Sequence, residues 1–191
     1  MRVLDFCEDK GYIYIVFELV QSGDLKKNLR LIKHNLPTLS FTAIEGAVAN
    51  IMHQVILAIT FLHKQGCVHR DLKPENVLVK WERVNDNESR ATCKVTDFGF
   101  AKVYKQDTKM KLQLGTAPYM APELLRRSEY DETVDIWAIG VMAFYLLFNK
   151  LPFRGINVKQ VSQSVELKTK EPDYVFSKNL QISKKAKNFI H

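Results

Sequence analysis

Two polar stretches near the middle of the chain hold side chains suited to phosphoryl transfer. Residues 69–76 read HRDLKPEN, and residues 97–99 read DFG directly after a predicted strand. The first stretch offers a carboxylate, a cation and an amide, and the second offers another carboxylate. Moving a phosphoryl group requires a proton acceptor for the attacking hydroxyl, a nearby cation and metal ions that neutralise the phosphates. The sequence therefore holds a candidate for each part.

Each of these residues also has a plainer interpretation when it is taken alone. Asp71 and Asp97 are of a type that caps turns, Lys73 is of a type that lies on surfaces, and a match as short as DFG often arises by chance. Eight matched positions before DFG, and GTAPYMAPE at residues 115–123 after it, outweigh that interpretation. In this order, the three stretches resemble the catalytic loop, metal-binding motif and substrate loop of eukaryotic-type serine/threonine protein kinases.

The resemblance implies a role for each chemical residue. Asp71 is expected to be the base, Lys73 to steady the transferring phosphate, and Thr116 to bond both of them. Asn76 and Asp97 are expected to hold Mg²⁺, a hard ion that prefers oxygen ligands. Lys73 and Thr116 resemble the serine/threonine class rather than the tyrosine class. The expected cofactors are ATP and Mg²⁺, and the expected substrate is a protein.

The nucleotide side of the site is implied by residues 15–20, IVFELV, which resemble the strand and linker that carry adenine. Phe17 is expected to be the gatekeeper. Two backbone positions of the linker should bond the adenine edge, a carboxylate should reach the ribose, and an apolar residue should form the floor. The residues expected to bind the nucleotide are Glu18, Val20, Asp24, Glu75, Leu78 and Asp97.

Two further residues are expected to support the catalytic loop. Asp135 resembles the buried aspartate that anchors this loop in the family. His69 is expected to pack against Phe98 as a strut rather than to act as a base. His53 and His63 show no metal-ligand spacing and are interpreted as packing or surface residues.

Arg70, next to the expected base, is typical of kinases whose activation segment is ordered by a phosphate. The usual phosphate position falls on residues 111–114, KLQL, which carry no hydroxyl. Within residues 100–114, only Tyr104 and Thr108 carry one. We therefore take Thr108 as the candidate phosphosite; the alternative is an ordinary loop threonine.

Apolar residues at helical spacing predict the elements that must position these groups. Thr42 and Glu45 match a capping box before a long amphipathic helix that ends near Gly66. The helices are predicted at residues 24–33, 42–65 and 133–148, with another helical pattern starting at 182. The last full helix is almost wholly apolar, which indicates burial on nearly all sides.

Short runs of β-branched and aromatic residues predict two hairpins. The first pairs a strand near residues 2–6 with one at residues 12–17. The second pairs residues 77–79 with 93–96, and the polar stretch at 81–90 is predicted to be its loop. Residues 97–123 show no period, which is typical of a long functional loop.

Composition limits the remaining classes of function. The 191 residues carry a net charge of +7, but the basic residues are spread along the chain, so no nucleic-acid partner is expected. The start of the chain does not resemble a signal peptide, and residues 136–148 are too short to cross a bilayer, so no membrane partner is expected. Three cysteines without metal spacing favour a reducing cytoplasmic or nuclear setting.

The expected fold is α+β and kinase-like, with a mainly helical large lobe and a remnant of the small-lobe β-sheet. Residues 1–20 are assigned to small-lobe strands and hinge, and residues 21–191 to a large lobe with its C-terminal helices truncated. No glycine-rich loop or strand lysine of the small lobe occurs in the sequence. We expect a partial kinase domain; the alternatives are a catalytically weak kinase-like interaction module and a small-molecule phosphotransferase. Residues 100–102 and 81–90 resemble the calcium/calmodulin-dependent kinase group.

Overall fold

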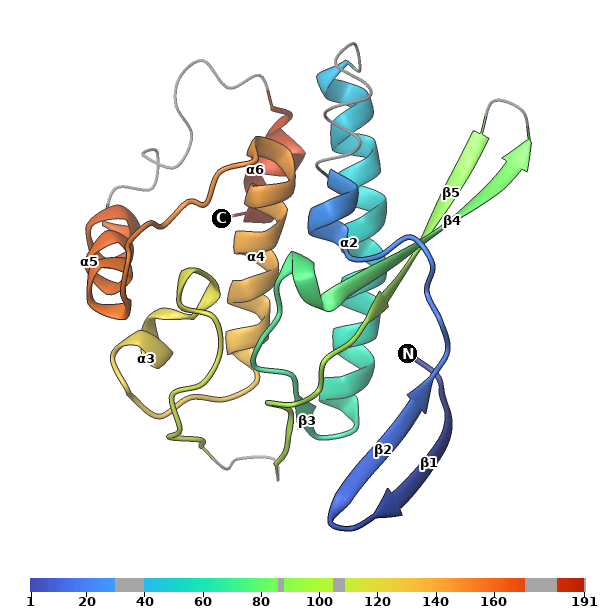
Figure 1. Cartoon of the computed structure of the whole chain (residues 1–191). Coiled ribbons are helices and arrows are strands. Elements are labelled where there is room, and N and C mark those ends of the chain that lie inside the picture. The colour runs from blue at the N-terminus through green and yellow to red at the C-terminus, as the bar shows by residue number, and fades with distance from the viewer. Residues whose placement is uncertain (30–39, 86–87, 105–108, 171–181, 191) are drawn as a thin grey trace.

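Two long helices form the body of the protein. The computed structural model describes residues 1–29, 40–85, 88–104, 109–170 and 182–190. Helix α2, Phe41–Lys64, lies beside α4, Thr133–Phe148, and the shorter α6, Lys184–Ile190, packs on α4 (Figure 1). Helix α5, Val158–Thr169, contacts α3, Pro122–Leu125, and the 3₁₀ turn η2, Ala117–Tyr119.

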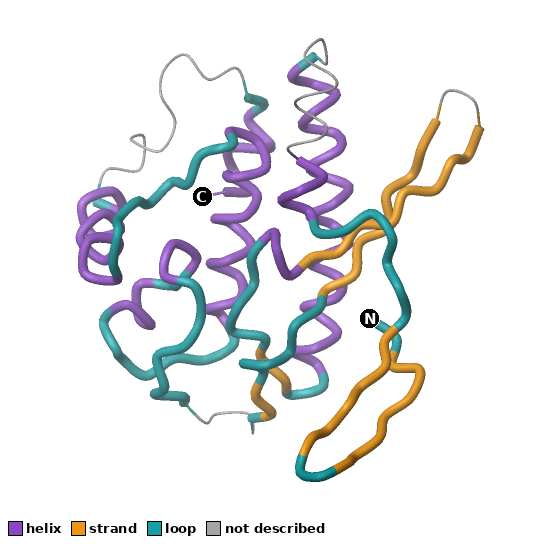
Figure 2. The backbone as a smooth tube through the Cα atoms, in the orientation of Figure 1, coloured by secondary structure: helices purple, strands orange, loops and turns teal. Residues whose placement is uncertain are grey.

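The strands form small antiparallel pairs rather than one sheet (Figure 2). Strand β1, Val3–Asp9, pairs with β2, Tyr12–Phe17, and β4, Val77–Asn85, pairs with β5, Glu88–Val95. The two-residue strand β3, Cys67–Val68, pairs with β6, Lys102–Val103. Helices and small hairpins together match the expected α+β class.

Helix α2 begins one residue earlier than predicted, and its N-cap lies two residues before the predicted one. The Ser40 side chain accepts a hydrogen bond from the amide of Ala43 at 3.3 Å, so Ser40 is the N-cap. The predicted capping box at Thr42 and Glu45 is therefore wrong. The Glu45 carboxylate instead accepts a hydrogen bond from the amide of Ser183, at 2.6 Å, and so binds the distant segment before α6.

One apolar face of α2 builds the core. Residues at helical spacing along this face are buried, and they contact α4 and β5. They are Val48, Ile51, Met52, Val55 and Ile59. By length and composition α2 is also apolar enough to cross a membrane. Its one-sided packing against α4 is that of a core helix in a folded domain.

Helix α4 has the bounds predicted from the sequence and is buried along most of its length. Met142 is fully covered and Leu146 is 1% exposed, whereas Ile136 is 55% exposed. The helix ends at Asn149, whose φ of 53° places it in the left-handed region that terminates helices. Because it is apolar on most sides, α4 can carry a rigid polar anchor in the middle of the domain.

The hairpin β4–β5 is longer than predicted, so the expectation of a polar loop at residues 81–90 is wrong. Lys80 pairs with Thr92 and Glu82 with Arg90 across the two strands. The strand pattern failed there because these strands project from the body, where no core selects apolar residues (Figure 1). The side chain of Gln54 on α2 holds the base of the hairpin: it donates to the Ala91 carbonyl at 3.0 Å and accepts from the Cys93 amide at 2.9 Å.

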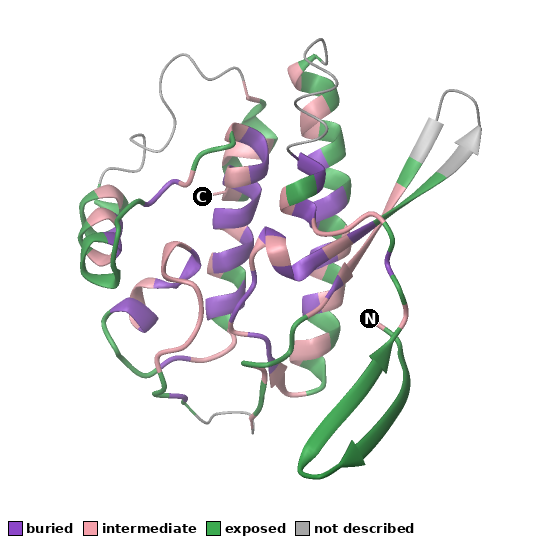
Figure 3. Ribbon diagram, in the orientation of Figure 1, coloured by how far each residue is buried: buried purple, intermediate pink, exposed green. Residues whose placement is uncertain are grey.

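The first hairpin is exposed on both faces (Figure 3). Its turn residues Lys10 and Gly11 have φ values of 47° and 84°, as a two-residue hairpin turn requires. Phe6 and Ile13 are about 70% exposed, at 71% and 70%. An isolated two-stranded hairpin is marginally stable in water, so the apolar side chains of β1 and β2 form a surface suited to further strands or a partner.

One helix prediction is tested only in part, and one helix was missed. Residues 25–29 are helical, but the remainder of the helix predicted at 24–33 lies outside the described residues. Helix α5 was not predicted. Only Val161 and Val165 are buried, and the remaining positions are mostly polar, which gives a weak periodic signal.

The core face of α2 yields a stability prediction. Ile59→Ala removes a side chain that is 1% exposed and leaves a cavity against α4, so the free energy of unfolding should fall by about 2–5 kcal/mol. Leu57→Ala on the same helix, where Leu57 is 56% exposed, is the matched control and should change it by less than about 0.5 kcal/mol. Urea unfolding measures both. Equal losses would contradict the assigned core face.

Candidate active site

Strand pairing brings the two chemical stretches of the sequence together. Val77, at the start of β4, pairs with Val95, at the end of β5. The amide of Thr96 donates to the carbonyl of Asn76 at 2.9 Å. The end of the HRDLKPEN stretch therefore lies beside the residue that precedes Asp97. The hairpin β4–β5 is the element that joins the two motifs.

Asp71, Lys73 and Thr116 form a closed triangle of hydrogen bonds. The Lys73 ammonium lies 2.6 Å from Asp71 Oδ2 and donates to Thr116 Oγ1 at 2.9 Å. The Thr116 hydroxyl donates to Asp71 Oδ1 at 2.7 Å. Asp71 is only 4% exposed, so its carboxylate depends on these partners. The three residues predicted to work together are thus in contact.

Gly115 permits Thr116 to approach the catalytic loop this closely. Its φ is 115°, and a Cβ at this position would lie 2.6 Å from the carbonyl oxygen of Arg70. Any other residue would clash with this backbone atom and be strained at this φ. The glycine of the GTAPYMAPE stretch is therefore required by geometry.

Asn76 and Asp97 each offer side-chain oxygen atoms to a metal ion. The Asn76 amide group donates to the Asp71 backbone carbonyl at 2.8 Å and to Asp71 Oδ2 at 3.1 Å. Because the Asn76 nitrogen makes both of these bonds, the side-chain oxygen Oδ1 remains as an acceptor. Asp97 is exposed, with a φ of 61°. The donor set fits Mg²⁺, which takes one or two protein ligands and leaves its other positions to phosphate and water.

No compact all-protein metal cage exists in the part of the chain that the structure describes. Groups of three or more His, Cys, Asp or Glu side chains close enough for a metal are absent among these residues.

A buried carboxylate on α4 holds the backbone of the catalytic loop. Asp135 Oδ2 accepts from the amide of His69 at 2.9 Å, and Oδ1 accepts from the amide of Arg70 at 2.9 Å. Asp135 Oδ2 also lies 2.9 Å from His63 Nε2. Arg70 has a φ of 70°, a strained value for this residue type, so the anchor holds a conformation that the loop would otherwise leave.

The contact of His63 was missed in the sequence. It joins residues 72 positions apart, and no local pattern marks it.

His69 is a strut, in the predicted geometry. Its ring lies 5.2 Å, between centroids, from the ring of Phe98. Its Nε2 is 3.0 Å from the carbonyl oxygen of Thr96, which can only accept, so Nε2 carries the proton. Its Nδ1 then accepts from the amide of Asp71 at 3.3 Å. His69 thereby connects the two motifs.

The linker residues predicted to meet adenine lie next to β4. The carbonyl of Gly23 accepts from the amide of Val79 at 2.9 Å, and Asp24 forms a β-bridge with Leu78. Val20 is buried, and Leu78 is half-buried at the same junction. The linker and Leu78 are therefore neighbours, and the adenine contacts of these residues stay a prediction.

Three of the four carboxylates predicted on the nucleotide side, those of Glu18, Asp24 and Glu75, have protein partners. Glu18 accepts from Lys94, which is the main reason that its pKa is lowered, and its backbone amide is used by the Arg2 carbonyl at 3.0 Å. Its carbonyl is therefore the atom left for the adenine edge. Asp24 accepts from the Lys27 amide at 2.8 Å and caps the helical residues 25–29.

Glu75 pairs with Lys26 through one oxygen. Its other oxygen, Oε2, is buried without a hydrogen-bond partner among the described residues. A buried unpartnered carboxylate oxygen is costly, so this atom is a natural acceptor for an incoming donor.

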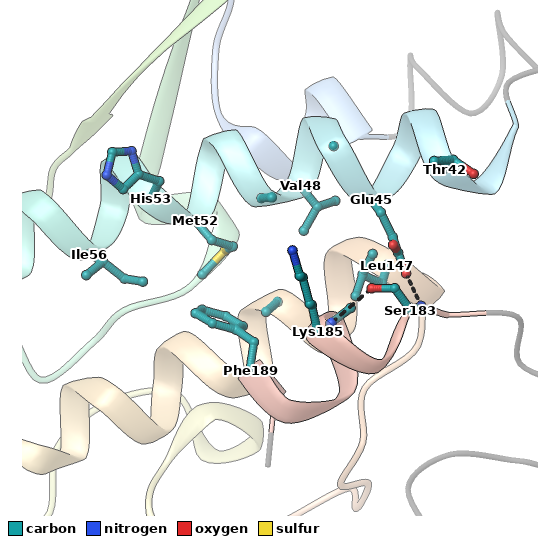
Figure 4. Close-up of a pocket in the computed structure, with 14 residues that line it drawn as sticks. Thr42, Glu45, Val48, Met52, His53, Ile56, Leu147, Ser183, Lys185 and Phe189 are labelled. Atoms are coloured by element: carbon teal, nitrogen blue, oxygen red, sulfur yellow. Dashed lines mark hydrogen bonds between the residues drawn. The ribbon is translucent and has the colours of Figure 1, made fainter.

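A large cavity lies away from these residues. It has a volume of about 560 Å³ and an apolar lining contributed by α2, α4 and α6, including Met52, Leu147 and Phe189 (Figure 4). It contains none of the predicted site residues. A smaller pocket is lined by Asp71, Thr116 and Asp135.

The family model described as "Protein kinase domain" matches residues 1–191. The chain therefore belongs to the protein kinase family, and the predicted kinase fold and serine/threonine kinase class are confirmed.

Curated relatives agree with this assignment. "Calcium-dependent protein kinase 4" of Plasmodium berghei (strain Anka) is 35% identical over 190 residues, which cover 100% of this chain and 33% of that protein. "Myosin light chain kinase A" of Dictyostelium discoideum is 35% identical over 180 residues, 93% of this chain and 55% of that protein. "Ribosomal protein S6 kinase alpha-4" of Homo sapiens is 33% identical over 190 residues, 95% and 23% respectively. The chain thus spans between about a quarter and a half of the length of these relatives.

The anchor yields a prediction for Asp135→Asn. In the variant, an NH₂ group replaces one carboxylate oxygen and faces an N–H group that now donates to that oxygen. One buried hydrogen bond is therefore lost, and its donor is left unpaired. We expect the free energy of unfolding to fall by about 2–4 kcal/mol. Asp9→Asn, in the exposed strand β1, is the control and should have little effect. Chemical denaturation of both variants measures this, and an unchanged Asp135→Asn midpoint would refute the anchor.

Proposed function

We propose that this chain carries the catalytic half of a serine/threonine protein kinase that transfers the ATP γ-phosphate to protein hydroxyls. The hydrogen-bonded triangle of Asp71, Lys73 and Thr116 is the observation that supports this most strongly. It places a carboxylate, an ammonium and a hydroxyl in mutual contact. The loop that carries the carboxylate and the ammonium is held by the buried Asp135. This is the arrangement that in-line phosphoryl transfer needs.

In the proposed reaction, Asp71 orients the substrate hydroxyl and accepts its proton. Lys73 lies beside the carboxylate and offsets the negative charge that gathers on the transferred group. Thr116 fixes the direction of both side chains. Mg²⁺ bound by Asn76 and Asp97 would neutralise the phosphates of ATP. The protein groups supply orientation and charge, and their fixed hydrogen bonds remove the need for rearrangement during the reaction.

We further propose that the triphosphate is covered by small-lobe elements that these 191 residues do not contain. The motifs of a glycine-rich loop and a strand lysine are absent from the sequence. The apolar side chains of β1 and β2 are exposed, as expected of strands that pair with such elements. The 191 residues alone should therefore transfer phosphate slowly. We place the protein in a reducing compartment, the cytoplasm or nucleus, because its cysteines are free thiols.

The role of the base is tested by Asp71→Asn in the protein at its full natural length. With Mg²⁺ and ATP, the wild type should phosphorylate serine or threonine in a peptide, and the variant should lose about 10²–10⁴-fold in kcat because no group accepts the proton. Phosphopeptide formation measured by mass spectrometry gives both rates. Asp9→Asn is the control.

Absence of any transfer by the wild type would instead favour the catalytically weak interaction module. The exposed faces of β1 and β2 would then be its binding surface.

Thr116 is tested by a matched pair of variants. Thr116→Ala removes the hydroxyl that joins Lys73 to Asp71, and we expect kcat to fall about 10-fold, the equivalent of about one hydrogen bond. Thr116→Ser keeps the hydroxyl and should retain most of the activity. Steady-state kinetics with saturating ATP separates the two. Equal activity of the alanine and serine variants would contradict a role for the hydroxyl.

A further inference from the structure

The side chain of Arg70 is bound by neutral protein groups. Its Nε donates to the carbonyl oxygen of Phe100 at 2.6 Å, and its Nη1 donates to the hydroxyl of Tyr130 at 3.2 Å. The Tyr130 hydroxyl in turn donates to the carbonyl oxygen of Leu112 at 2.8 Å. One buried hydroxyl, on a residue that is 2% exposed, therefore connects the neighbour of the catalytic base to the segment that precedes Gly115.

The same segment is joined to Tyr130 through the backbone. The amide of Met110 donates to the Tyr130 carbonyl at 2.8 Å, and the amide of Tyr130 donates to the Met110 carbonyl at 3.0 Å. Met110 is 3% exposed. Residues 110–112 are thus held at two points by a single tyrosine. Met110 and Tyr130 are buried at the first point, whereas Leu112 at the second is 64% exposed.

Ion pairs flank this bridge on both sides. Lys109 pairs with Asp131, and Lys111 with Glu129 at 3.0 Å. The hydrogen bond from Lys109 is the main cause that lowers the pKa of Asp131 to about 2. Exposed ion pairs contribute little individually. These ion pairs help to align residues 109–111, while the hydrogen bonds of the buried Tyr130 hold the segment.

In kinases whose activation segment is ordered by phosphorylation, a phosphate on that segment pairs with an arginine. Here residues 111–114 carry no hydroxyl that could be phosphorylated, and Thr108 lies outside the described residues. Tyr130 makes an equivalent connection. Its hydroxyl oxygen accepts a hydrogen bond from Arg70, and the same hydroxyl donates one to the carbonyl of Leu112 in the segment. The connection that a phosphate would make is already complete without one.

We propose that Tyr130 is a positioning residue that holds the activation segment in its substrate-accepting form through neutral hydrogen bonds, so that no phosphate on the segment is needed. This inference rests on the proposed kinase function. It predicts an effect on the protein substrate and none on the nucleotide, because Tyr130 contacts the segment and Arg70 but none of the residues expected to bind ATP.

The kinetic test uses Tyr130→Phe in the protein at its full natural length. This change removes one hydroxyl and keeps the buried ring. We expect the KM for a peptide substrate to rise about 10-fold, the loss of about two hydrogen bonds with partial compensation, while the KM for ATP stays within about twofold. Leu57→Ala, at an exposed position on α2 that contributes to neither the active site nor the segment, is the control and should change neither. An unchanged peptide KM in Tyr130→Phe would overturn the proposal.

A second measurement needs no kinase activity. Trypsin cleaves after lysine, and Lys109 and Lys111 lie on the segment that Tyr130 holds. We expect cleavage after these two residues, measured by mass spectrometry, to be several-fold faster in Tyr130→Phe and unchanged in Leu57→Ala. Equal cleavage rates in wild type and Tyr130→Phe would overturn the proposal even if no phosphorylation were observed, so its failure and that of the proposed function are distinguishable.

Independence from phosphate is tested on the wild type. Treatment with a broad-specificity phosphatase, followed by its removal, should leave peptide phosphorylation within about twofold of the untreated rate. Thr108→Ala should behave in the same way. Loss of activity in either experiment, restored by rephosphorylation of the treated wild type, would show that a phosphate is required and would overturn the proposal.

Discussion

The buried carboxylate of Asp135 is the constraint on which the catalytic site depends. A charge that is 1% exposed is stable in a protein only when donors surround it, and here two backbone amides and a histidine ring do so. These donors belong to the end of α2 and to the catalytic loop. The hydrogen bonds that stabilise this carboxylate therefore also fix the strained backbone at Arg70. That backbone in turn sets the orientation of the Asp71 side chain.

The apolar character of α4 is explained by its role in carrying Asp135. A helix that carries a polar anchor through the middle of a domain must be held on several sides, and α4 is packed by α2, α6 and η2. Rigid support of this kind keeps a catalytic side chain within the narrow geometry that transfer chemistry tolerates. From the anchor outward, each step adds a contact that restrains the next: the loop backbone, His69, Asp71, and finally Thr116.

The sequence predicted those parts of the structure that depend on local patterns. The bounds of α4 followed from an unbroken apolar run, and the Asp71, Lys73 and Thr116 contacts followed from motif resemblance. Contacts between distant side chains left no such signal. His63 reaches Asp135 across 72 residues, and Gln54 binds the backbone of β5 from α2. The extended strands at residues 81–90 were missed because pairing of the backbone, rather than burial of apolar residues, maintains them.

The most direct test of the central claim is a crystal structure with Mg²⁺, a non-hydrolysable ATP analogue and a serine peptide bound to the protein at its full natural length. The account predicts the serine hydroxyl within about 2.6–3.2 Å of a carboxylate oxygen of Asp71. It also predicts metal ligation by Asn76 Oδ1 and the Asp97 carboxylate. A nucleotide bound elsewhere, or a metal that contacts neither of these two residues, would contradict it.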